Sequence, residues 1–269
     1  MRAKKALGQN FLVDGNVVAN IVTAARLGAE DRVLEIGPGR GVLTTRLAER
    51  AARVVAVEWD RELLPLLTEK LGGFPDTNIV HGDILRTDLG ALLTPIWPGR
   101  WKVVANLPYN ISSQVLFKLI EERRLFSELL LMLQKEVGER LTASPSTKDY
   151  GVLTVLSTLY FDIEKVLLVK PSSFRPIPKV DSVVLRFRIL PQPRLDVGDE
   201  MVFRRVVKAA FAQRRKTLWN CLRAAALVPD VRLLAEILDR AGIDGGRRGE
   251  TLSLEEFAAL TKSVVEVCP

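Results

Sequence analysis

Short apolar runs alternate along the first half of the chain with segments in which apolar residues recur every three or four positions. The runs cover residues 32–36, 53–58, 78–81, 102–105 and 129–133. Continuous apolar runs of this length are typical of strands buried on both faces of a parallel sheet. Helical periodicity covers residues 42–50, 60–71 and 111–122, and an earlier helix begins after Asp14, which can cap its first turn. The alternation predicts an α/β fold with a mostly parallel sheet.

The pattern changes near Gly151. Residues 151–159 have helical periodicity, and two longer strands are predicted over 163–169 and 180–190, the last with apolar side chains alternating at 183, 185, 187 and 189. A late strand pair of this kind is compatible with an antiparallel edge. Pro191-Gln-Pro-Arg is a natural boundary, and from Met201 onward only helical periodicity occurs, ending in a helix with a Ser253-Leu-Glu-Glu capping box. We therefore predict an α/β domain over 1–192 and a small all-helical domain over 193–269.

Composition narrows the class of protein only modestly. The 269 residues are 48% hydrophobic, enough for a sizeable core, and a net charge of +7 weakly favours an anionic partner. Two cysteines are too few for a disulfide framework, which favours the cytoplasm. The uncharged stretch around 150–161 has about a dozen residues and is short of the roughly 20 that span a bilayer, as is every other uncharged run in the sequence. His81 is the single histidine, so neither a metal cluster nor a Ser-His-Asp triad is predicted.

A glycine turn and two acidic residues follow successive predicted strands. Gly37-Pro-Gly-Arg-Gly41 joins the first strand to a helix, and its glycines, Gly37 and Gly39 among them, allow close approach of the backbone to a ligand. The spacing differs from the dinucleotide pattern G-x-G-x-x-G, which disfavours a nicotinamide dehydrogenase. Glu58 ends the second strand and can accept both hydroxyls of a ribose, while Asp83 follows the third strand and can reach an adenine amino group. All three elements fall at the carboxyl edge of the sheet, where open α/β sheets bind ligands.

The fourth strand ends in Asn106-Leu-Pro-Tyr109, and so lies at the same edge. The amino group of a nucleobase is a poor nucleophile because its lone pair is delocalised into the ring. Two acceptors that grip its N–H groups, the Asn106 side-chain carbonyl and the Leu107 main-chain carbonyl, would favour a more tetrahedral nitrogen. Pro108 fixes φ without adding a donor, and Tyr109 can lie flat against an extruded base. Such a site would work by positioning, without a general base.

The ordered motifs also resemble those of a known family. Leu7-Gly-Gln-Asn-Phe-Leu12, the glycine turn with Glu35, and Asn106-Leu-Pro-Tyr109 are followed by Gln134-Lys-Glu-Val137 and Ser173-Phe-Arg-Pro-Ile-Pro-Lys-Val-Asp-Ser182. Over nearly the whole chain the sequence resembles the S-adenosylmethionine-dependent adenine dimethyltransferases of small-subunit ribosomal RNA. The resemblance implies a seven-stranded Rossmann-like methyltransferase sheet, mostly parallel with an antiparallel edge, and a small helical C-terminal domain.

The resemblance also assigns roles to residues. It implies S-adenosylmethionine as the methyl donor, without a metal, and cofactor contacts at Asn10, Leu12, Gly37, Gly39, Glu58, Asp83 and Asn106. It implies that the base is handled by Asn106, Leu107, Pro108 and Tyr109. It adds Phe174, which is expected to stack on the other face of the adenine.

The segment 201–223 has seven basic residues and no acidic one. Arg204, Lys208 and Arg215 are predicted to share one face of a helix, either as a solvated basic face or as a surface that contacts RNA phosphates. Lys4 and Lys5 are predicted to extend that surface across the cofactor site. Phe203, Phe211 and Trp219 are predicted to form a core stripe.

The sequence therefore predicts a cytoplasmic, monomeric enzyme that transfers methyl groups to the 6-amino groups of two adjacent adenines in small-subunit ribosomal RNA, within a pre-small-subunit particle and away from membranes. Two alternatives stay open. One is a large-subunit ribosomal RNA adenine methylase of the resistance type, and the other is a non-catalytic RNA-binding assembly or transcription factor on the same scaffold.

Overall fold

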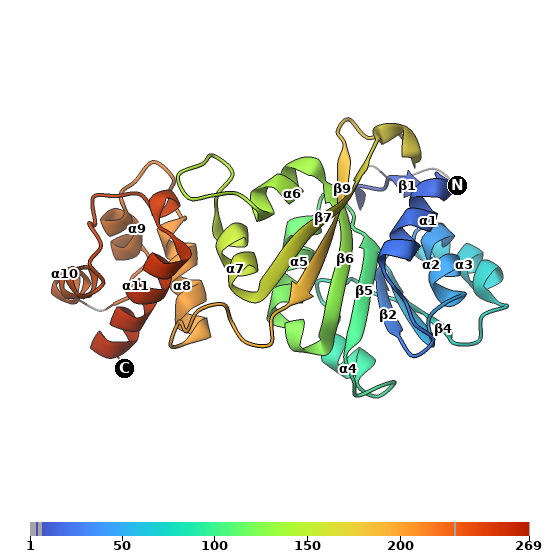
Figure 1. Ribbon diagram of the computed structural model, residues 1–269, viewed down its shortest axis with the longest axis horizontal. Coiled ribbons are helices and arrows are strands. Elements are labelled where there is room, and N and C mark those ends of the chain that lie inside the picture. Colours follow the sequence, from blue (N-terminus) through green and yellow to red (C-terminus); the bar gives the residue numbers. More distant parts are fainter. Residues whose placement is uncertain (1–3, 5–6, 229, 269) are drawn as a thin grey trace. The chain divides into compact units, whose positions relative to one another are not determined.

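The computed structural model describes residues 4, 7–228 and 230–268, and these fall into two compact units. The first unit comprises residues 1–138 and 162–189 and is built on a sheet (Figure 1). The strands of this sheet, within the described residues, are β2 (Arg32–Ile36), β3 (Arg53–Glu58), β4 (Thr77–His81), β5 (Trp101–Asn106), β6 (Phe126–Gln134), β7 (Phe161–Val169) and β9 (Ser182–Ile189). The helices that precede residue 142 are α1 (Gly15–Ala24), α2 (Val42–Ala48), α3 (Leu64–Leu71), α4 (Leu89–Leu93), α5 (Ser112–Glu121) and α6 (Lys135–Leu141).

The strands have the order β4-β3-β2-β5-β6-β9-β7. Strands β2 to β6 run parallel, whereas β9 pairs antiparallel with β6. Strand β7 lies next to β9 and forms the edge of the sheet. This confirms the predicted seven-stranded mixed sheet and its late antiparallel pair. The chain reverses its direction of progress between β2 and β5, and such a switch point leaves a crevice at the carboxyl ends of the two strands.

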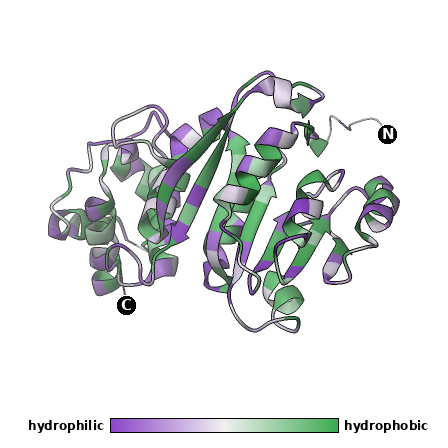
Figure 2. Cartoon of the chain, turned by 45° about the vertical axis from the view of Figure 1, so that its right-hand side comes forward, coloured by the Kyte–Doolittle hydropathy of each residue, from purple (hydrophilic) through white to green (hydrophobic). Residues whose placement is uncertain are grey.

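The sheet is buried on both faces, as its apolar strands predicted. Buried residues of six strands, β2, β3, β5, β6, β7 and β9, form one hydrophobic cluster with apolar residues of α1 and α2. On β2, β3, β5, β6 and β9 a neighbour in sequence is also buried. Figure 2 shows the central strands coloured as hydrophobic along most of their length. Asp14 accepts hydrogen bonds from the N–H groups of Asn16 and Val17, which confirms it as the N-cap of α1.

A two-stranded ribbon at the N-terminus was not predicted. Strand β1 (Phe11–Leu12) pairs antiparallel with β8 (Phe174–Arg175), which follows the 3₁₀ helix η4 (Pro171–Ser173). The Ser173 hydroxyl donates to Asp14 at 3.0 Å. This ribbon joins the segment before α1 to the segment before β9.

The second unit comprises residues 139–161 and 190–269 and is helical. Its helices are α7 (Val152–Tyr160), α8 (Glu200–Ala210), α9 (Leu218–Ala224), α10 (Val231–Arg240) and α11 (Leu254–Val267). Phe203 and Phe257 are fully buried, and the Phe211 ring packs against Tyr150 and Phe257. The predicted capping box of α11 is present, because Ser253 and Glu256 exchange side-chain and backbone hydrogen bonds.

The compact units differ from the predicted domains in one segment. Residues 139–161, which include α7, group with the C-terminal helices, although the predicted first domain extended to residue 192. The first unit ends at Ile189, the last residue of β9. The division into domains at 192 and 193 stays a prediction. No helix in the part of the chain that the structure describes is both long and apolar enough to cross a bilayer.

Candidate methyl-transfer site

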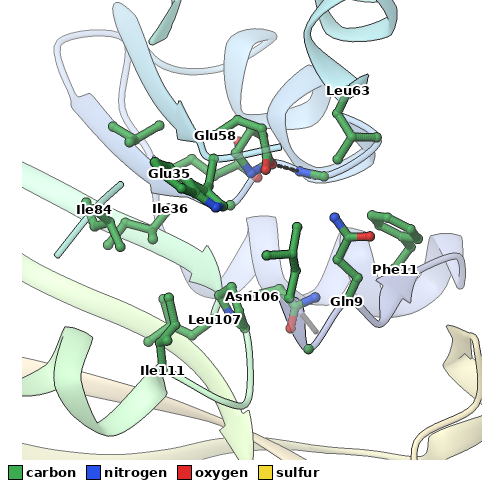
Figure 3. A pocket seen from close by; sticks show the side chains of 18 of the residues that line it. Gln9, Phe11, Glu35, Ile36, Glu58, Leu63, Ile84, Asn106, Leu107 and Ile111 are labelled. Atoms are coloured by element: carbon green, nitrogen blue, oxygen red, sulfur yellow. Dashed lines mark hydrogen bonds between the residues drawn. The ribbon is translucent and has the colours of Figure 1, made fainter. Parts of the chain in front are cut away.

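A cavity of about 270 Å³ lies at the switch point between β2 and β5. Its volume is near the lower end of the range for cofactor sites. The wall next to β2 and β3 carries the glycine turn, Glu35 and Glu58, and the opposite wall carries Asn106 to Tyr109. Figure 3 shows Glu35 and Glu58 across the cavity from Asn106 and Leu107, with Gln9 and Phe11 closing one side.

The glycine turn brings the backbone close to its neighbours. Gly37 and Gly39 have φ of +68° and +59°, a conformation that costs other residues free energy. A Cβ atom on Gly39 would lie 3.0 Å from the Phe11 ring, and one on Gly37 would lie 3.6 Å from Pro108. The positive φ favours glycine at both positions, and at Gly39 the close contact with Phe11 adds to that preference, whereas the Gly37 contact is an ordinary one.

Glu58 is held in place by the backbone of two loops. Its Oε2 accepts a hydrogen bond from the Gly39 N–H at 3.0 Å, and its Oε1 accepts one from the Asp60 N–H at 2.8 Å. Burial raises the pKa of the carboxyl above its ordinary value, although these two hydrogen bonds oppose the shift. The carboxylate is thus fixed at the end of β3, beside the glycine turn.

Asp83 also lines the cavity, directly after β4. Its Oδ1 accepts from the Leu85 N–H at 3.0 Å, and its Oδ2 lies 3.6 Å from the Arg86 guanidinium. Its contact with an adenine amino group stays a prediction.

The Asn106 side chain lines the cavity and has a buried acceptor without a partner among the described residues. Its Nδ2 donates to the Asn10 carbonyl at 3.3 Å. Because a carbonyl can only accept, the amide nitrogen must face Asn10, and the amide oxygen must point the other way. Among the described residues that buried oxygen has no hydrogen-bond partner. A buried acceptor without a partner costs free energy, which indicates a site for a donor that arrives with the substrate.

The rest of the Asn106–Tyr109 turn is anchored to neighbouring strands. The Leu107 N–H donates to Met132 in β6 at 3.1 Å, and the Tyr109 hydroxyl lies 2.5 Å from the Ser182 hydroxyl in β9. Burial raises the pKa of Tyr109, so the phenol is neutral at physiological pH. These contacts fix the ring without making it a base.

Phe174 lies elsewhere. Its side chain is fully buried, pairs in register with Leu12 across the small ribbon, and packs in the core with α1. The described structure does not bring it to the cavity, and its stacking on the adenine stays a prediction. Asn10 and Leu12, in contrast, line the cavity, and their contact with the cofactor stays a prediction.

The basic residues of the second unit were predicted to share a helix face, and this is wrong for one of them. Arg204 and Lys208 lie one turn apart on α8, but α8 ends at Ala210 and Arg215 follows in the exposed connection to α9. In the first unit, Lys4 pairs with Asp60 and Glu62. Lys5 lies outside the described residues.

Sequence reasoning missed two residues of the site, Glu35 and Trp59. Glu35 is 2% exposed, lines the cavity, and has an Oε2 atom without a hydrogen-bond partner in the described chain. Burial raises its pKa to about 8, and the nearby Glu58 carboxyl adds to the shift. Trp59, which is 52% exposed, lines the rim and stacks on His81 with ring centroids 6.0 Å apart. The acidic residue before the glycine turn was visible in the sequence but had received no role.

The sheet order and the polar groups at its carboxyl edge define a Rossmann-like methyltransferase. The family model for ribosomal RNA adenine dimethylase matches residues 1–260, and the chain belongs to that family. It is 58% identical over 265 residues to ribosomal RNA small subunit methyltransferase A of Geobacter sulfurreducens, with 98% of this chain and 96% of the relative covered. The same-named protein of Clostridium acetobutylicum is 44% identical over 263 residues, covering 98% and 94%.

Two solved structures are similar over most of their length. A dimethyladenosine transferase from Plasmodium falciparum has 28% identity and a TM-score of 0.76, with 93% of this chain and 95% of that chain covered. The 23S rRNA methyltransferase ErmE has 30% identity and a TM-score of 0.65, with coverage of 95% and 100%.

Proposed function

We propose that this protein dimethylates the 6-amino groups of two adjacent adenines in small-subunit ribosomal RNA, using S-adenosylmethionine, within a pre-small-subunit particle in the cytoplasm. The single observation that carries the chemistry is the buried Asn106 oxygen, which lacks a donor in the described chain and belongs to a residue that lines the cavity. The family and the 58% identity to a small-subunit methyltransferase support the substrate.

The residues present fit the cofactor. The left-handed glycine turn leaves room for a ligand beside the backbone of Gly37 and Gly39, and Glu58 offers a fixed carboxylate for the ribose hydroxyls. Asp83 would accept from the adenine amino group. When bound, S-adenosylmethionine supplies an electrophilic methyl group on a sulfonium.

The protein's own contribution is positioning. The Asn106 oxygen and the Leu107 carbonyl would accept hydrogen bonds from the target amino group, which favours a more tetrahedral nitrogen whose lone pair is less delocalised into the ring. Tyr109, anchored by Ser182, would support the extruded base. Positioning of this kind can contribute up to about 7–11 kcal/mol. The methylated nitrogen is cationic and sheds its proton readily to solvent, so a general base is not required.

The large-subunit alternative has one observation in its favour, the similarity to ErmE at 30% identity. The small-subunit relatives are far more similar, at 58% and 44%. A non-catalytic role is disfavoured because Glu58 and Asn106 both stand in the cavity with acceptor groups in place.

Nucleoside mass spectrometry tests the proposal. Small subunits that lack the modification, and large subunits in parallel, are incubated with the protein and S-adenosylmethionine. We expect dimethyladenosine in the small subunit alone. Product in the large subunit alone would favour the resistance-type reaction, and RNA binding without product in either would favour an assembly or transcription factor.

A further inference from the structure

Asp60 occupies a junction beside the cavity that the proposed mechanism does not use. Its backbone N–H donates to Glu58 Oε1 at 2.8 Å. Its side chain is 6% exposed and accepts from Lys4 Nζ at 2.7 Å and from Gln9 Nε2 at 2.9 Å. Asp60 therefore connects Glu58, at the end of β3, to Lys4 and Gln9 in the N-terminal segment of the chain.

The Asp60 carboxylate is charged and accepts several hydrogen bonds. Burial alone would raise the pKa of Asp60, but the hydrogen bonds from Lys4 and Gln9 outweigh it, so the pKa is lowered and the group stays charged. The carboxylate also accepts from the Glu62 N–H, and Glu62 adds a second ion pair to Lys4 at 2.8 Å. Charge-assisted bonds to a buried carboxylate are stronger than those of an exposed pair.

The segment held by Asp60 continues to the reaction centre. The Lys4 N–H donates to Gln9 Oε1 at 2.7 Å, which orients the Gln9 amide toward Asp60. The next residue, Asn10, provides the carbonyl that accepts from Asn106 Nδ2. Residues 7–12 line the cavity along this path. A chain of contacts thus runs from Glu58 through Asp60, Gln9 and Asn10 to Asn106.

We propose that Asp60 is a positioning residue for methyl transfer: through Lys4 and Gln9 it holds residues 7–12 against the cavity, so that the Asn10 carbonyl fixes the Asn106 amide with its oxygen free for the substrate. This inference rests on the proposed function. It assigns Lys4 to the tether, whereas the sequence had suggested a contact with RNA phosphates.

Asp60→Asn is the main test, because asparagine keeps the size, the backbone N–H and the ability to accept from the Glu62 N–H. Lys4→Met removes the ion pairs from the other side, and Lys4→Arg is the conservative rescue. The matched control is Asp76→Asn, which removes another aspartate ion pair, to Arg53 at 2.7 Å, at the start of β4 and away from the carboxyl edge.

Two readouts are used on the full chain. Hydrogen exchange of the peptide that covers residues 7–12 needs neither cofactor nor RNA. Single-turnover methyl transfer at saturating S-adenosylmethionine, with KM for RNA measured separately, reports the reaction. We expect faster exchange in Asp60→Asn and Lys4→Met, a rate lower by about tenfold to a hundredfold, and an unchanged KM for RNA. Lys4→Arg and Asp76→Asn should resemble the wild type.

Two results would overturn the inference. Exchange and rate in Asp60→Asn that match Asp76→Asn would show that the tether positions nothing. A raised KM for RNA in Lys4→Met, with exchange unchanged, would indicate that Lys4 contacts RNA phosphates and does not act as a tether. A wild type that methylates no RNA would instead reject the proposed function, while faster exchange in Asp60→Asn would still support the tether.

Discussion

Glu58 and Asn106, on opposite walls of the cavity, differ in how their acceptors are satisfied; Glu35, on the same wall as Glu58, also has an oxygen without a partner in the described chain. On the wall next to β3, both oxygens of Glu58 already accept hydrogen bonds from the backbone. On the wall next to β5, the Asn106 oxygen has no partner within the described residues. A satisfied acceptor must exchange or share hydrogen bonds when a ligand arrives, whereas an unsatisfied one gains the full interaction. The first wall therefore suits binding, and the second suits a group that must be gripped during the reaction.

Removing the free acceptor should have the largest effect. In Asn106→Ala the target amino group loses a preorganised partner, and by analogy with other preorganised groups the rate should fall by about 10²–10³-fold. Single-turnover kinetics with unmodified small subunits measures it. A loss below about threefold would contradict the gripping role.

Glu35, on the wall next to β2 and β3, makes the stability of the protein depend on pH. Its pKa rises from 4.5 to about 8 on folding, so the folded state binds the proton more tightly than the unfolded state. The contribution of protonated Glu35 to the free energy of unfolding is fully present below about pH 4.5 and is lost as the pH rises through about 8. Glu35→Gln should therefore be more stable than the wild type at pH 8.5, by a few kcal/mol (order of magnitude), with no gain near pH 4.5. Thermal unfolding at several pH values checks this, and a pH-independent difference would contradict it.

Arg204, Lys208 and Arg215 are not among the residues that line the cavity, so changing them should affect RNA binding without affecting either wall. Changing Arg204, Lys208 and Arg215 to Glu should weaken RNA binding and flatten its dependence on log salt by about 2.7, at about 0.9 for each lost phosphate contact. Affinity for S-adenosylhomocysteine should not change. Binding isotherms at several salt concentrations measure both, and unchanged RNA isotherms would identify a merely solvated surface.

The smallest expected effect concerns the second methyl transfer. A monomethylated base has one N–H left for the two acceptors, so the second step should depend more on stacking. Tyr109→Ala should raise the ratio of monomethyladenosine to dimethyladenosine by a few fold, about the worth of one stacking contact. Nucleoside mass spectrometry reports this ratio, and an unchanged ratio would argue against the stacking role.

Much of the fold could be predicted because its strands are continuous apolar runs. The bounds of β2 and β3 agree with the predicted 32–36 and 53–58, and Asp14 and Ser253 mark helix starts by local hydrogen bonds. The helix predicted over 60–71 instead begins as a short 3₁₀ turn, η2 (Arg61–Leu63), before α3. Local chemistry determines these features, so sequence patterns detect them.

The missed features depend on contacts between distant segments. Phe174 is buried because β8 pairs with β1, more than 160 residues earlier, and neither two-residue strand has a detectable pattern. The Asp60 tether joins residues 51 and 56 positions apart. Arg215 was placed on a helix face because its periodicity continued, but α8 ends before it.

The most direct test compares the two walls in one experiment. Asn106→Ala and Glu58→Gln are each assayed for S-adenosylhomocysteine affinity by calorimetry and for single-turnover rate at saturating cofactor. We predict that Asn106→Ala loses mainly rate, whereas Glu58→Gln loses mainly affinity, by about 10–100-fold for a hydrogen-bonded charged group. Equal losses of rate and affinity in both variants would contradict a division of the cavity into a binding wall and a gripping wall.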